Sequence, residues 1–115
     1  PVAAALDAAC ALADGLRRKG LAPTIVLLTD GRANVARDGA GGRERAEADA
    51  LGAARSCRAL RFTALLVDTS PRPGPAAERL AAEMGARYLP LPRADAKAIS
   101  KAIRAVPPAP VTRAG

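Results

Sequence analysis

Hydrophobic positions recur along the chain with two different periods, and helical and extended patterns alternate. Between Ala3 and Lys19 the apolar residues follow i, i+3, i+4 spacing, which predicts an amphipathic helix that Gly20 ends. The next segment, Thr24–Thr29, is a continuous apolar and β-branched run. Such a run is typical of a strand that is buried on both faces of a parallel sheet.

The same two patterns repeat to the end of the chain. We predict further helices over residues 44–60, 76–84 and 94–105, and further strands over residues 62–67 and 87–91. Pro90 places the last strand at a sheet edge, because proline cannot donate to a ladder of hydrogen bonds. This order predicts an α/β fold, an open parallel sheet with helices on both faces. We assign residues 1–106 to this unit and residues 107–115 to a flexible, proline-rich tail.

Composition fits one small domain and excludes several kinds of site. The chain has 115 residues, half of them hydrophobic, which suits a single packed core better than a disordered segment. It has no His and only two Cys, so a zinc site of usual composition and a His-dependent catalytic triad are both excluded. Cys10 and Cys57 fall in predicted helices, where we expect small buried thiols rather than nucleophiles.

The net charge of +7 raises the question of nucleic-acid binding. Only Phe62 and Tyr88 could stack on bases, and the Arg residues are scattered rather than grouped. We therefore expect a solvated or protein-binding surface and no nucleic-acid partner. The apolar run at residues 25–28 is too short for a membrane span, so we expect a cytoplasmic protein.

The beginning of the sequence resembles the middle of a domain. The chain starts at Pro1 and enters the first predicted helix at once, without a signal-peptide pattern. Three strands are few for an open parallel sheet, and the first of them would lack a neighbour on one side. We expect strands to be missing on the N-terminal side, which would leave the isolated chain marginally stable.

Two aspartates follow predicted strands, where open α/β sheets bind ligands. Asp30 and Asp68 are each either an oxygen ligand for a cation such as Mg²⁺ or an ordinary turn residue. The segment from Asp68 begins like an Asp-x-Ser-x-Ser metal loop, but Arg72 stands at its fifth position. A cation there would oppose metal binding, so we interpret this segment as a structural turn or a partner surface.

The glycine-rich segment at residues 39–42 does not form a known nucleotide-binding motif. It lacks the Lys and Ser or Thr of a phosphate loop, and it does not directly follow a strand as a dinucleotide-binding motif would. A small Rossmann-like enzyme is therefore a disfavoured alternative, and we assign no catalytic residue to this chain.

Three segments, taken together, resemble a known family. They are TDGRANVARDG (residues 29–39), DTSPRP (residues 68–73) and MGARYLPLPRAD (residues 84–95). They resemble the C-terminal von Willebrand factor A (integrin I-like) domain of the D-type subunits of magnesium chelatases. The resemblance implies a Rossmann-like A fold in a complex that uses ATP to insert Mg²⁺ into protoporphyrin IX for (bacterio)chlorophyll synthesis. It implies the I-type ATPase subunit and the H-type porphyrin-binding subunit of that complex as partners, with ATP bound elsewhere in the complex.

The resemblance also implies site residues. A complete A domain holds Mg²⁺ with three loops, of which only the last is present here, at Asp30; the metal site of this chain is then incomplete. Partner contacts are expected at residues just beyond strand ends, namely Arg32, Asn34, Arg37, Arg72 and Arg93. An A-domain adaptor of another AAA+ system, such as a cobalt chelatase, is the alternative that keeps the same fold.

Overall fold

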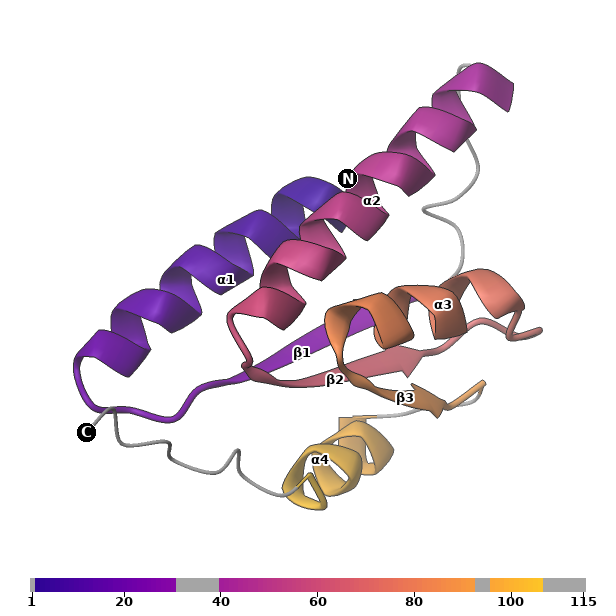
Figure 1. Cartoon of the computed structure of the whole chain (residues 1–115). Helices are drawn as coiled ribbons and strands as arrows, with labels where there is room; N and C mark the ends of the chain where they lie inside the picture. Colours follow the sequence, from indigo (N-terminus) through magenta and orange to yellow (C-terminus); the bar gives the residue numbers. More distant parts are fainter. Residues whose placement is uncertain (1, 31–39, 93–95, 107–115) are drawn as a thin grey trace.

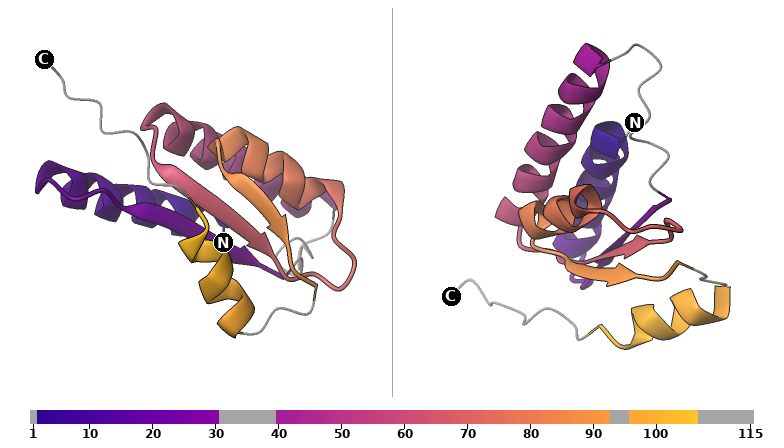
Figure 2. Two further views of the ribbon diagram at one scale, coloured as in Figure 1. Left: turned by 90° about the horizontal axis from the view of Figure 1, so that it is seen from below. Right: turned by 90° about the vertical axis from the view of Figure 1, so that its right-hand side faces the viewer.

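A computed structural model describes residues 2–30, 40–92 and 96–106. Its elements are α1 (Val2–Arg18), β1 (Thr24–Thr29), α2 (Ala40–Ala59), β2 (Thr63–Asp68), α3 (Pro75–Met84), β3 (Arg87–Pro90) and α4 (Ala96–Arg104). The three strands form one parallel sheet in the order β1-β2-β3. Helices α1, α2 and α3 lie on one face of the sheet and α4 lies on the other (Figures 1 and 2). The predicted open parallel α/β arrangement is confirmed.

Strand β2 is the buried centre of the sheet. Leu65, Leu66 and Val67 are fully buried, because β2 has a strand on each side and helices on both faces. Strand β1 has the predicted bounds but is not buried on both faces, and Leu28 is 53% exposed. This part of the prediction was wrong: Ile25 and Leu27 face the main core, so Leu28 lies on the opposite face of β1.

The main core lies between the sheet and helices α1, α2 and α3. Helix α1 buries Leu6, Cys10 and Ala13 there, at the spacing that the sequence predicts. Helix α3 adds Ala81 and Met84 and then ends at a left-handed Gly85, whose φ is 67°. Glycine adopts this conformation without strain, so the predicted stop is confirmed.

Helix α2 starts earlier than its sequence pattern predicts. The pattern places its first residue at Glu44, whereas the helix begins at Ala40 and so takes in part of the glycine-rich segment. Glycine costs a helix only about 1 kcal/mol relative to alanine, which a helix of this length can absorb. The buried residues of α2 are mostly small ones, namely Ala50, Leu51, Ala53, Ala54 and Cys57.

The two cysteines are paired, which corrects the expectation of two separate thiols. Cys10 of α1 and Cys57 of α2 form a disulfide, with their Cα atoms 6.1 Å apart. Both side chains are buried in the main core, as predicted. Sequence spacing alone did not indicate the pair, because the two residues lie 47 positions apart.

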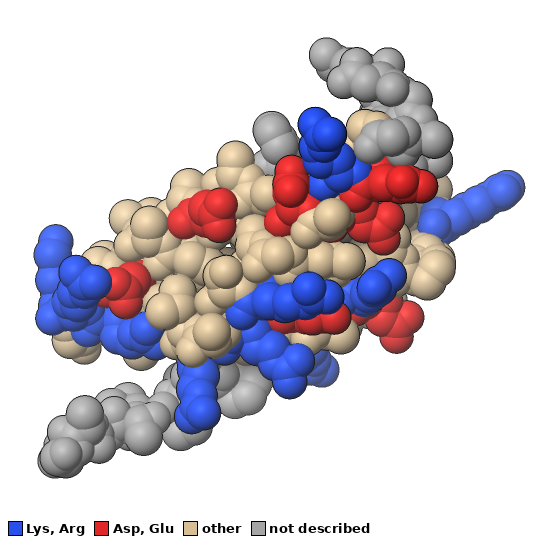
Figure 3. Space-filling view, turned by 45° about the horizontal axis from the view of Figure 1, so that its top comes forward, with Lys and Arg blue, Asp and Glu red and all other residues tan. Residues whose placement is uncertain are grey.

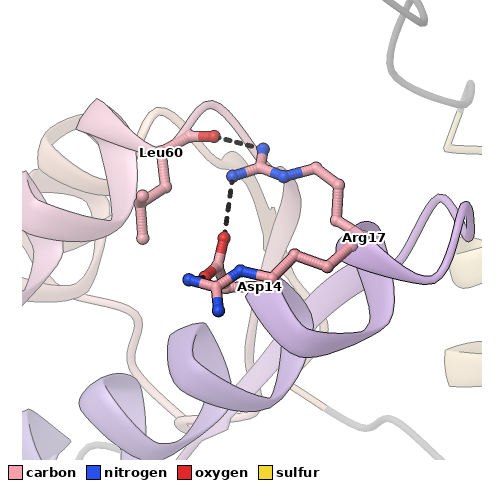
Figure 4. A network of polar contacts seen from close by, with 4 residues as sticks. Asp14, Arg17 and Leu60 are labelled. Carbon is pink, nitrogen blue, oxygen red and sulfur yellow. Dashed lines mark hydrogen bonds and ion pairs between the residues drawn. The ribbon is translucent and has the colours of Figure 1, made fainter.

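Arg17 joins the end of α1 to the segment between α2 and β2 (Figure 4). Its guanidinium donates to the carbonyl oxygen of Leu60 at 2.6 Å and contacts Asp14 at 3.4 Å. The same group lies 4.1 Å from the centre of the Phe62 ring, within the range of a cation–π contact. Arg17 thus links the C-terminal end of α1 to the residues that directly precede β2.

A candidate metal and partner site at the carboxyl edge of the sheet

The carboxyl ends of the three parallel strands meet at one edge, and hydrogen bonds between strand ends hold the loops there. Thr69 donates to the carbonyl oxygen of Thr29 from its backbone nitrogen at 2.8 Å and from its hydroxyl at 3.2 Å. The backbone nitrogen of Leu91 donates to the carbonyl oxygen of Asp68 at 2.8 Å. These bonds fix the residue that follows β1, Asp30, relative to the end of β2.

Asp30 lies at a groove of about 310 Å³ between the end of β1 and the start of α1. The groove is lined by Val2, Leu27, Leu28, Thr29, Asp30 and Thr69. Asp30 is exposed and is the one carboxylate among the lining residues. Because Val2 is the first residue of α1, the positive end of that helix dipole faces the groove and favours a negatively charged side chain. The lining of the groove therefore combines one carboxylate residue, two threonines and apolar side chains.

The described residues do not by themselves form a complete site for a hard cation. Mg²⁺ takes about six oxygen ligands in octahedral geometry and usually keeps several waters. The oxygen-bearing side chains among the lining residues are those of Asp30, Thr29 and Thr69, and the hydroxyl of Thr69 already donates to the carbonyl oxygen of Thr29. No group of three His, Cys, Asp or Glu side chains comes together in the described parts of the chain. The role of Asp30 as a metal ligand stays a prediction, and any such site needs further ligands.

Of the residues expected to contact a partner, one falls in the described part of the chain. Arg72 is exposed in the loop between β2 and α3, beyond the same sheet edge as Asp30. The other four, Arg32, Asn34, Arg37 and Arg93, lie outside the described residues. The partner role of all five stays a prediction.

Asp68 is the other aspartate of this edge, and it is fully buried. Its carboxylate accepts hydrogen bonds from the backbone and hydroxyl of Ser70 and, at 2.7 Å, from the phenol of Tyr88. Burial by itself raises the pKa of Asp68, but these hydrogen bonds outweigh burial and leave the pKa lowered. The carboxylate is thus engaged inside the protein, which supports the structural interpretation of this segment rather than a metal loop.

Tyr88 makes a structural contact that the sequence pattern does not predict. We considered its ring only as a surface that could stack on bases, whereas its hydroxyl binds a buried carboxylate 20 residues away. Burial and the negative charge of Asp68 both disfavour the phenolate and raise the pKa of Tyr88 to about 12. The Asp-x-Ser turn at Asp68 signals only the bond from Ser70, since Asp commonly accepts from the residue two positions on.

An alkaline titration tests this contact. Tyr88 is the only tyrosine and the chain has no tryptophan, so the rise in near-ultraviolet absorbance that accompanies phenolate formation reports this residue alone. We expect a pKa of about 12 in the folded chain. Since the folded pKa lies above the ordinary value of 10.0, the stability contributed by Tyr88 is complete below pH 10 and is lost as pH rises toward 12.

The matched control for this titration is Asp68→Asn, which removes the charge but keeps the size of the side chain. Its Tyr88 pKa should return toward the ordinary value. A folded wild-type chain that already titrates at the ordinary value would show that the phenol does not bind the carboxylate.

Surface charge is divided rather than uniform. Figure 3 shows basic side chains gathered at the end of the molecule where α1 ends, with Arg17 and Arg18 in its last turn. Acidic side chains lie farther along the same face, so this face is not a continuous basic surface. Within the described residues, no helix has both the length and the apolar character needed to cross a membrane.

Comparison with known proteins gives two close relatives with the same name. The magnesium-chelatase 60 kDa subunit of Cereibacter sphaeroides is 44% identical over 105 residues, which are 91% of this chain and 19% of the relative. The magnesium-chelatase 60 kDa subunit of Rhodobacter capsulatus is 46% identical over 96 residues, which are 84% of this chain and 17% of the relative. No protein-family model and no solved structure matches the chain.

The chain therefore spans less than a fifth of the length of these relatives. The matched regions cover 84–91% of this chain. Over the region that is compared, the chain is therefore similar to the magnesium-chelatase 60 kDa subunits of two bacteria.

Proposed function

We propose that this chain is the A-domain part of a D-type subunit in a magnesium chelatase, the complex that uses ATP to insert Mg²⁺ into protoporphyrin IX. The observation that carries the proposal is 44–46% identity to two magnesium-chelatase subunits over most of the chain. Mg²⁺ and the porphyrin are the substrates of the whole complex in this proposal. The chain itself contributes binding surface rather than catalytic groups.

The carboxyl edge of the sheet is the proposed contact surface. Asp30 stands exposed at a groove that the start of α1 and the end of β1 enclose. Such a carboxylate suits a divalent cation that is completed by oxygen ligands from outside the described residues. Arg72, exposed beyond the same edge, suits a carboxylate on a partner protein. We propose the ATPase subunit and the porphyrin-binding subunit as the partners on this edge.

Binding to these partners provides the test. The Cereibacter sphaeroides 60 kDa subunit, with its matching region replaced by this chain, is titrated against the other two chelatase subunits in the presence of Mg²⁺. We expect Asp30→Ala to weaken binding to at least one partner by about tenfold, equivalent to about 1.4 kcal/mol. The fold should be unaffected, because Asp30 is exposed.

Asp49→Ala is the matched control, since Asp49 is an exposed aspartate on α2. Its binding should equal that of the unsubstituted hybrid subunit. If the Asp30→Ala and Asp49→Ala proteins bind equally well, Asp30 does not contribute to partner binding.

A further inference from the structure

The disulfide between α1 and α2 joins two of the helices that cover one face of the sheet (Figure 1). Cys10 and Cys57 are 7% and 4% exposed, and their Cα atoms lie 6.1 Å apart, within the usual range of about 4.4–6.8 Å for a disulfide. Both helices place small side chains in the same buried cluster, among them Ala13 of α1 and Ala54 of α2, and small side chains let helices approach closely. The backbone thus holds the two sulfur atoms in position to bond.

We propose that Cys10 and Cys57 form a reversible redox site, oxidised to a disulfide and reduced to two thiols by exchange with a low-molecular-weight disulfide or dithiol. Both forms suit this position. A free cysteine behaves as a small hydrophobic residue, so the reduced pair remains compatible with the surrounding core.

The exchange chemistry balances with glutathione as the co-reactant. The thiolate of one cysteine attacks oxidised glutathione, forms a mixed disulfide and releases one glutathione thiolate. The second cysteine attacks the protein sulfur of that mixed disulfide and releases the other glutathione. Two protein thiols are oxidised to one disulfide, one molecule of oxidised glutathione is reduced to two molecules of glutathione, and the two thiol protons pass to the released thiolates or to solvent.

The cysteine pair is linked through α1 to the groove at the carboxyl edge of the sheet. Cys10 lies eight residues after Val2, about 12 Å along the helix at 1.5 Å per residue, and Val2 lines the groove beside Asp30. The bond closes a long loop between residues 47 positions apart, which restricts the unfolded chain and holds α1 against α2. Reduction removes this restraint, so α1 and the groove wall that it supplies become less stable. Because the sulfurs are buried, exchange requires α1 to separate transiently from α2.

The redox state is measured directly on this chain. After incubation of the native chain with oxidised glutathione, denaturation and alkylation, intact mass should show one intramolecular disulfide and no alkylated thiol. After incubation with dithiothreitol, the same procedure should show two alkylated thiols. The oxidised form should melt about 10 °C above the reduced form. Hydrogen exchange in α1 should be faster after reduction.

The control is the double variant Cys10→Ala with Cys57→Ala, whose melting temperature should not respond to either reagent. The mass measurement decides the proposal even where that variant fails to fold, because it uses the unsubstituted chain. Two alkylated thiols after oxidised glutathione, a disulfide-linked dimer, or equal melting temperatures of the two forms would each overturn the proposal.

Discussion

Leu66→Ala should lower the free energy of unfolding by about 3 kcal/mol, because it removes a fully buried side chain and leaves a cavity in the core. Leu66 is in the central strand β2 and belongs to the main core between the sheet and helices α1, α2 and α3. Native domains have only about 5–15 kcal/mol of stability in total, so this loss is a large share of it. Chemical denaturation of the two proteins under the same conditions measures the difference.

Leu12→Ala is the matched control, since it is the same substitution at a residue of α1 that is 69% exposed. Its effect should stay within about 0.5 kcal/mol. Similar losses for the two variants would contradict the placement of β2 at the centre of the sheet.

Asp68→Ala should cost about 3 kcal/mol, for a different reason. It deletes a buried carboxylate and leaves Ser70 and the phenol of Tyr88 without their acceptor. The folded pKa of Asp68 is lowered, so its contribution to stability is present above the ordinary value of 3.8. That contribution is lost as pH falls through the folded pKa. Denaturation at neutral pH and at acidic pH measures both effects.

A double-mutant cycle separates this network from loss of packing. Tyr88→Phe removes one hydroxyl group and should cost about 1–2 kcal/mol. With Asp68 already replaced by Ala, Tyr88→Phe should cost much less, because the phenol has lost its acceptor. Additive losses would show that Tyr88 and Asp68 act independently.

Local sequence patterns predicted the elements well, because helix and strand periods depend on near neighbours. The bounds of β1 and the stop at Gly85 are both confirmed. The start of α2 was misplaced, since glycines weaken a helical pattern without preventing a helix. The edge position of β1 was anticipated from the small number of strands, although its exposure was not.

Contacts across the fold were not predictable in the same way. The bond from Tyr88 to Asp68 depends on the register of β3 beside β2, where Leu66 pairs with Tyr88 and Asp68 pairs with Pro90. The pairing of Cys10 with Cys57 depends on how two helices pack. Neither arrangement leaves a periodic signal in the sequence. The position of Asp30 at the sheet edge, by contrast, was predictable because it directly follows a strand, and the structure places it beside a groove. Its role as a metal ligand stays a prediction.

Magnesium insertion by the reconstituted complex tests the proposed function most directly. The assay uses the Cereibacter sphaeroides 60 kDa subunit in which this chain replaces the matching region, with the other two chelatase subunits, ATP, Mg²⁺ and protoporphyrin IX. We predict that this hybrid subunit supports insertion, and that Asp30→Ala lowers its rate by about tenfold while Asp49→Ala does not. A hybrid subunit that folds and binds its partners but supports no insertion would contradict the account.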